Sequence, residues 1–161
     1  MRKIVPCIVA GLSLVGGSAY ASQTSTTFTV DVTIQAQCVI NSASNLTFGT
    51  QGVLTANVDA TSTISVQCTD TTTYDIGLDK GAGSGASVTT RKLTNGSTTI
   101  NYSLYTNVGR STVWGNTVST DTVSATGNGA AQSYTVYGRI PAQTTPAPNA
   151  YSDTITVTVT Y

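Results

Sequence analysis

The sequence contains no histidine and no glutamate, and charged residues make up only 9% of its 161 residues. Soluble domains usually carry roughly 25% charged residues. Without His or Glu, general acid–base catalysis would fall to Asp or Tyr. Nucleophile elbows, metal-ligand spacings and phosphate-binding loops are also missing from the sequence. We therefore expect a protein that is not an enzyme, with no catalytic, cofactor-binding or metal-binding residues.

Basic residues and long apolar runs are equally scarce. The seven Lys and Arg residues form no cluster that could neutralise a phosphate backbone, which argues against nucleic-acid binding. The longest apolar run, residues 4–15, is too short for a transmembrane helix. It follows two basic residues and precedes small residues that end at Ala21, the pattern of a secretory signal. We expect a cleaved signal peptide over residues 1–21, cleavage between Ala21 and Ser22, and no transmembrane segment in the mature chain.

Three cysteines are present, and Cys7 lies inside the expected signal peptide. An exported chain that keeps an even pair should oxidise it, so we expect a disulfide between Cys38 and Cys68. Closing a loop of about 30 residues stabilises a fold by about 3.5 kcal/mol in the chain-entropy description. The mature chain of about 140 residues has the size of one domain.

No segment shows a convincing helical repeat, whereas short runs with a period of two recur between Gly, Asn, Asp and Ser clusters. These runs predict an all-β, antiparallel sandwich of immunoglobulin type. The disulfide would join an early strand to the next, and Trp114 falls outside it, unlike in an antibody domain. The expected strands include residues 45–49, 62–68, 74–79, 100–105, 118–123 and 133–140, with a hairpin turn at Asn95–Gly96.

The two strongest alternating segments are 28–38 and 151–161. In each, apolar residues share one parity and therefore one face of an extended strand. These residues are Phe28, Val30, Val32, Ile34, Ala36 and Cys38 in the first segment, and Tyr151, Ile155, Val157, Val159 and Tyr161 in the second. The sequence stops at Tyr161 with the pattern still apolar. We therefore expect the sandwich to lack its final strand and to leave an apolar groove that another segment fills.

Several motifs together resemble the spore coat protein U domain over essentially the whole mature chain. The family includes pilin subunits of archaic, Csu-type chaperone–usher systems. The motifs are Phe48-Gly49, Val66-Gln-Cys68, Arg91, Tyr102-Ser-Leu-Tyr105, Trp114-Gly115, residues 134–142 and residues 151–161. The resemblance implies an incomplete immunoglobulin-like fold whose partners are a periplasmic pilus chaperone, an outer-membrane usher and neighbouring pilin subunits, with export through the periplasm to a surface pilus.

The resemblance also implies different roles for two parts of the mature chain. Residues 22–37 would be a donor-strand extension, and residues 38–161 the pilin domain. The donor plugs would be Phe28, Val30, Val32, Ile34 and Ala36, and the acceptor-groove or chaperone-binding strand would present Ile155, Val157, Val159 and Tyr161. Burying four large plugs contributes on the order of 10 kcal/mol before costs.

The donor boundary stays open, because only Gln37 separates the plugs from Cys38. Either the donor spans Thr26 to Ile34, or residues 28–38 are mostly an internal first strand and Ser22 to Thr27 form a weak extension. Two other functions also stay open: a surface adhesin or carbohydrate-binding module, and a spore or cyst coat protein. A sugar platform would use Tyr74, Tyr102, Trp114 and other aromatics, which are more often sheet core. Arg91, Arg110 and Arg139 are expected to be solvated or paired with Asp.

Overall fold

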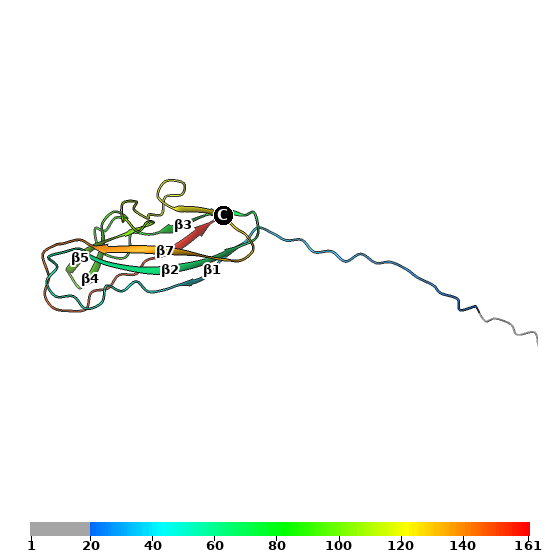
Figure 1. Ribbon diagram of the computed structural model, residues 1–161, viewed down its shortest axis with the longest axis horizontal. Helices are drawn as coiled ribbons and strands as arrows, with labels where there is room; N and C mark the ends of the chain where they lie inside the picture. Colours follow the sequence, from blue (N-terminus) through cyan, green and yellow to red (C-terminus); the bar gives the residue numbers. More distant parts are fainter. Residues whose placement is uncertain (1–19) are drawn as a thin grey trace, which may run out of the picture. The chain divides into compact units, whose positions relative to one another are not determined.

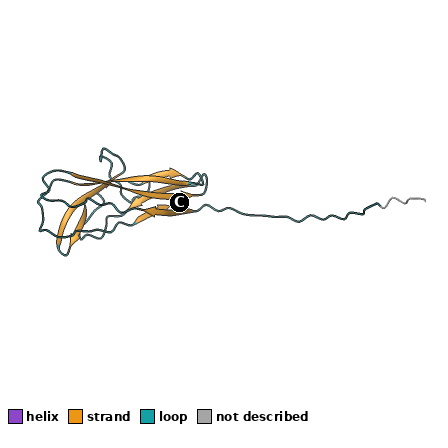
Figure 2. Ribbon diagram, turned by 60° about the horizontal axis from the view of Figure 1, so that its bottom comes forward, coloured by secondary structure: helices purple, strands orange, loops and turns teal. Residues whose placement is uncertain are grey.

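A computed structural model describes residues 20–161, and this part of the chain forms β-strands without a helix (Figures 1 and 2). None of its described residues form a helix suited to crossing a membrane. Most of the expected signal peptide lies outside the described residues. Ala21 and Ser22, at the expected cleavage site, are exposed and have no regular structure.

Two antiparallel sheets make up the sandwich. The first has the strand order β1-β2-β7-β5-β4, and the second has the order β6-β3-β8. The strands are β1 (Cys38–Ala43), β2 (Val58–Cys68), β3 (Thr73–Leu78), β4 (Arg91–Asn95), β5 (Thr98–Tyr105), β6 (Val123–Thr126), β7 (Ala131–Ile140) and β8 (Val157–Thr160). The expected all-β sandwich of immunoglobulin type is confirmed.

The core lies between the sheets and follows the strand alternation. On β2, Ile64, Val66 and Cys68 are buried, while Thr63 and Gln67 are exposed on the other face. This alternation places every second side chain in the core. Residues from both sheets complete the core, and they include Tyr74, Ile76, Leu78, Tyr102, Leu104, Trp114, Val136 and Ile140.

The hairpin between β4 and β5 forms where it was predicted, with one shift. Asn95 pairs with Thr98, so the two-residue turn consists of Gly96 and Ser97 and lies one residue later than expected. Gly96 has a φ of 60°, a conformation that glycine adopts at little cost.

The disulfide between Cys38 and Cys68 is confirmed. The two residues are the first register pair of β1 and β2, and their Cα atoms are 4.1 Å apart. Just outside the disulfide, the N–H of Thr69 donates to the carbonyl of Gln37 at 2.9 Å. The N–H of Gln37 donates to Thr69 Oγ1 at 3.1 Å. Gln37 is therefore held against the sandwich at the point where the preceding segment begins.

Residues 28–37, which carry the alternating pattern that begins at Phe28, have no strand partner among the described residues, and β1 begins at Cys38. Their apolar side chains are exposed, with Phe28 87% and Val32 84% accessible. The expected strand over 45–49 is also absent, and β6 begins at Val123 rather than at residue 118. The residues before β6 form a turn instead, in which the N–H of Thr120 donates to the carbonyl of Thr117.

Candidate functional site

An apolar groove opens between the chain that follows β1 and the chain that leads into β8. Each of these strands pairs with one neighbour, β1 with β2 and β8 with β3, and neither has a partner at its other edge within residues 20–161. Residues 43–48 line one side of the groove, and Asp153, Ile155 and Val157 line the other. The cavity between them measures about 510 Å³, and core residues line it deeper in, namely Ile64, Leu78, Tyr102, Leu104 and Val136.

The last segment changes strand partner along its length. Ser152 pairs with Thr94 of β4 through backbone bonds of 2.8 and 3.1 Å, whereas residues 157–160 pair with β3. The carbonyl of Thr156 accepts from the N–H of Asp79 at 3.1 Å. Ser152 is therefore bonded to the first sheet and residues 156–160 to the second, so the last segment passes from one sheet to the other.

The predicted acceptor residues occupy three kinds of position. Ile155 and Val157 line the groove directly. Val159 is half-buried and packs against the core. Tyr161 is 59% exposed and is not among the lining residues. The outward-facing residues between them, including Thr154, Thr156 and Thr158, are exposed, so the segment from 151 onward has one apolar and one polar face.

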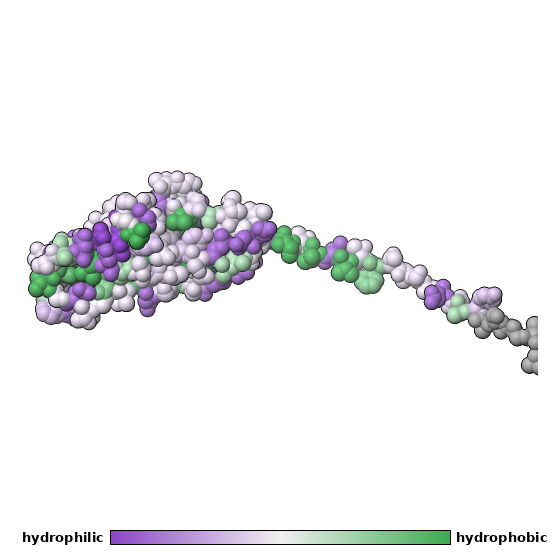
Figure 3. Space-filling view, in the orientation of Figure 1, coloured by the Kyte–Doolittle hydropathy of each residue, from purple (hydrophilic) through white to green (hydrophobic). Residues whose placement is uncertain are grey.

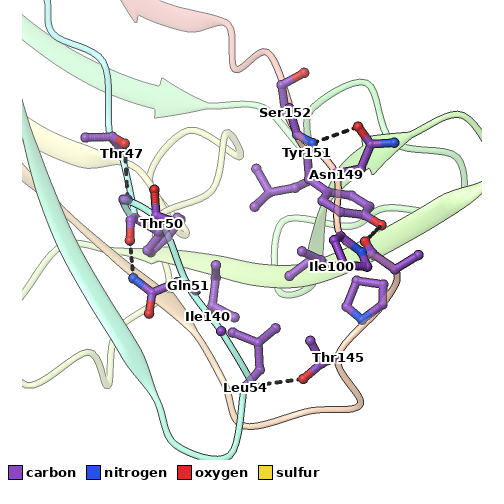
Figure 4. Close-up of a pocket in the computed structure, with 18 of the residues that line it drawn as sticks. Thr47, Thr50, Gln51, Leu54, Ile100, Ile140, Thr145, Asn149, Tyr151 and Ser152 are labelled. Carbon is purple, nitrogen blue, oxygen red and sulfur yellow. Dashed lines mark hydrogen bonds between the residues drawn. The ribbon is translucent and has the colours of Figure 1, made fainter.

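A second cavity of about 810 Å³ continues the groove at the end of the sandwich where the loops 49–54 and 144–151 lie (Figure 4). Leu54, Ile100 and Ile140 line it between these loops. The N–H of Leu54 donates to Thr145 Oγ1 at 2.8 Å, which ties one loop to the other. The two cavities share lining residues, namely Leu46, Thr47, Phe48, Leu93 and Asp153.

Gly138 makes room for one wall of the groove. A Cβ atom at this position would lie 2.8 Å from Leu46 Cδ1 and 3.1 Å from Phe48 Cζ. The absence of a side chain on β7 thus allows Leu46 and Phe48 to pack over the sheet. Phe48 also meets the Tyr102 ring edge to face, with ring centroids 6.2 Å apart. Sequence reasoning assigned no role to Gly138, since its effect depends on residues distant in the chain.

Asp153 is the charged residue that lines both cavities. The Tyr102 hydroxyl donates to Asp153 Oδ2 at 2.7 Å, and the N–H of Ala82 donates to Oδ1 at 2.8 Å. Burial and the bond to Asp153 raise the pKa of Tyr102, so the hydroxyl stays a donor at physiological pH. These bonds hold the last segment against β5 and the loop after β3. Sequence reasoning overlooked Asp153, although it shares the parity of the apolar residues around it.

The expectation for Arg91 is wrong, because its side chain is fully buried and pairs with no Asp side chain. Its guanidinium donates to the carbonyls of Asp79, Val88, Leu78 and Trp114 at 2.8, 2.8, 2.9 and 2.7 Å. Burial lowers the pKa of Arg91, while nearby negative groups oppose this effect. By contrast, Arg139 and Arg110 do contact Asp59, at 2.7 and 3.2 Å.

Half of the six aromatic residues considered for a sugar platform do not lie on the surface. Tyr74, Tyr102 and Trp114 are buried in the core. The hydroxyls of Tyr74 and Tyr134 are 2.6 Å apart, and their rings pack edge to face. The Trp114 indole N–H donates to the carbonyl of Ile76 at 2.8 Å. These contacts assign the three buried rings to packing.

Asp79 fastens the last segment through hydrogen bonds to its carboxylate. Its Oδ1 accepts the N–H groups of Thr156 and Gly81, each at 3.0 Å. Burial acts to raise the pKa of Asp79, but these hydrogen bonds outweigh it and the pKa lies below the ordinary 3.8. The carboxylate therefore contributes stability fully above 3.8, and this contribution is lost as the pH falls through the lower folded value.

We expect Asp79→Ala to destabilise the domain by about 2 kcal/mol at pH 7, because two N–H groups lose a charged acceptor. The difference from the unaltered protein should shrink as the pH falls below 3.8. Urea denaturation between pH 2 and 7 measures both effects. Asp70→Ala, which removes an exposed carboxylate, is the control. A difference that does not change with pH would contradict the assignment.

The arrangement suits an extended, alternating apolar segment. An inserted strand would form main-chain hydrogen bonds with the two open edges and place every second side chain into the cavities. The fold and the groove define the class as an immunoglobulin-like sandwich with an open side.

The chain belongs to the Spore Coat Protein U domain family, whose model matches residues 24–158. It is 33% identical over 177 aligned positions to Protein U of Myxococcus xanthus, covering the whole of this chain and 98% of that protein. The fold also resembles a chain in the complex of CsuC and CsuE, a chaperone–tip adhesion subunit pre-assembly complex from archaic chaperone-usher Csu pili of Acinetobacter baumannii. The TM-score is 0.59 at 24% identity, over 80% of this chain and 40% of that chain. This chain therefore spans less than half of that chain, and the similarity concerns the fold.

Proposed function

We propose that the protein is a structural subunit of a surface pilus and that it polymerises by donor-strand exchange. In this scheme residues 22–37 of one copy fill the groove of the next. The observation that carries the proposal is the groove with two unpaired strand edges, together with an exposed segment of the same chain that has an alternating apolar pattern. Catalysis is not part of the proposed role.

The donor and the groove agree in length and chemistry. Residues 28–36 span about 26 Å as a strand, and residues 151–161 span about 33 Å. The plugs Phe28, Val30, Val32, Ile34 and Ala36 would face Ile155, Val157 and the core residues of the groove. A shift by one residue would instead direct Asp31 into the apolar cavity, which is costly. The alternation of the donor therefore supports a single parity of insertion.

A subunit with an open groove needs protection before assembly. The proposed partners are a periplasmic chaperone that occupies the groove, an outer-membrane usher, and other pilin subunits. The shared fold with a chain of the CsuC–CsuE complex supports the chaperone. Export through the periplasm would lead to the cell surface, where the fibre would support adhesion or biofilm formation.

Removal of the donor tests the proposal. We expect the chain 22–161 to form fibres, and the chain 37–161 to form none while still accepting a donor. The chain 37–161 is also added to the chain 22–161 at one part in ten. It should end the growth of the fibres, so electron microscopy should show shorter fibres. Fibre formation by the chain 37–161 alone would exclude donor-strand exchange through this segment.

A coat protein of a resting cell is the second candidate, and the family description and the identity to Protein U favour it. Assembly through the groove would be the same, but the polymer would cover the cell instead of extending from it. Immunogold labelling of whole cells distinguishes thin surface fibres from a continuous outer layer.

A further inference from the structure

We infer that, in the polymer, the end of the sandwich that carries the loops 49–54 and 144–151 binds directly against the next copy, with Val53 in the contact. This inference rests on the proposed function. It adds a second contact between copies, outside the groove. Val53 is 76% exposed and lies at the rim of the larger cavity, which Pro146 and Pro148 also line. Apolar residues are visible on the surface at this end of the domain, at the left in Figure 3.

The end of the domain from which the donor segment leaves determines which end of that domain contacts the incoming copy. The donor segment leaves at the end where Cys38 pairs with Cys68, and β8 also finishes there, since Thr160 pairs with Asp75 near the start of β3. If the incoming domain met this same end, two copies could exchange segments mutually and close as a dimer. An open fibre requires a heterologous contact between different ends. The incoming domain must therefore lie at the opposite end, where the loops are.

The short tether brings the two domains together. Gln37 alone separates Ala36 from Cys38, and its N–H and carbonyl are both bonded to Thr69 of its own domain. Two residues of extended chain span about 7 Å. When Ala36 of the incoming copy occupies the groove of the receiving copy, the disulfide of the incoming copy therefore lies within this distance of the groove rim. An exposed valine at the rim would be covered by the incoming domain.

The test compares Val53→Ser with Val118→Ser in the full mature chain. Val118 is also exposed, at 47%, but lies outside both cavity linings. Polymers are formed from each variant, and their dissociation rates in urea are measured. Loss of one buried valine corresponds to about a tenfold change. We expect Val53→Ser polymers to dissociate about tenfold faster than unaltered polymers, and Val118→Ser polymers to differ by less than about twofold.

Thermal melting of the monomeric variants is the control for a folding defect. Because both valine side chains are exposed, we expect both variants to melt like the unaltered protein. Equal dissociation rates for Val53→Ser and unaltered polymers would overturn this inference and leave the groove mechanism intact. Failure of the unaltered chain to polymerise, or polymers that persist without residues 22–36, would overturn the proposed function and this inference with it.

Discussion

Val32→Asp should abolish assembly while leaving the folded domain unchanged. Val32 lies in the middle of the proposed donor and is 84% exposed in the single chain, so it contributes little to the fold of its own copy. In a neighbour's groove the new carboxylate would be enclosed by aliphatic and aromatic side chains. The change removes about 2 kcal/mol of apolar burial and adds the larger cost of an unpaired buried charge. Donor binding should fall by at least about 10³-fold.

Thr33→Asp is the matched control, because it adds the same charge to the opposite face of the strand. We expect its assembly rate to stay within about threefold of the unaltered chain. Light scattering during polymerisation compares the two variants, and thermal melting of the monomers should show no difference. Equal inhibition by both substitutions would mean that the segment acts through its net charge, and the parity of the donor would be refuted.

Arg91→Met should cost on the order of 4 kcal/mol of stability. The substitution keeps an apolar stem of similar length but removes every hydrogen bond of the buried guanidinium. The carbonyls of Leu78 and Trp114 would then be buried without these donors, and each unsatisfied polar group costs about 1–3 kcal/mol. Leu78 lines the groove and Asp79 holds the last segment, so donor binding should weaken as well.

Lys92→Met provides the comparison at the next position. Its Nζ donates to the carbonyl of Ser84 at 3.0 Å, but the side chain is partly solvated, and we expect a loss under about 1 kcal/mol. Urea denaturation with the disulfide intact measures both variants. If Arg91→Met is expressed only as aggregate, Arg91→Lys keeps the charge and should restore part of the stability. Equal denaturation midpoints for Arg91→Met and the unaltered protein would contradict the structural role of the guanidinium.

Local patterns predicted the strands whose partners are close in sequence or whose alternation is strong. The hairpin around Gly96 and the two faces of residues 151–160 follow from glycine conformation and from the alternating direction of side chains in a strand. The disulfide followed from an even pair of cysteines outside the expected signal peptide. Residues 28–37 alternate like a strand but pair with no strand among the described residues, because alternation defines a face and does not identify the edge with which it pairs.

The composition and periodicity of the chain were sufficient to establish an all-β sandwich with one disulfide, and an apolar face over residues 28–36 and over residues 151–161. The groove itself depends on contacts between distant residues. Tyr102 meets Asp153 across 51 positions, Arg91 bonds the carbonyl of Trp114 across 23, and Gly138 accommodates Leu46. A sequence pattern reports the direction of each side chain along its own strand, whereas only the packing of the two sheets decides which polar groups meet and which edges stay open.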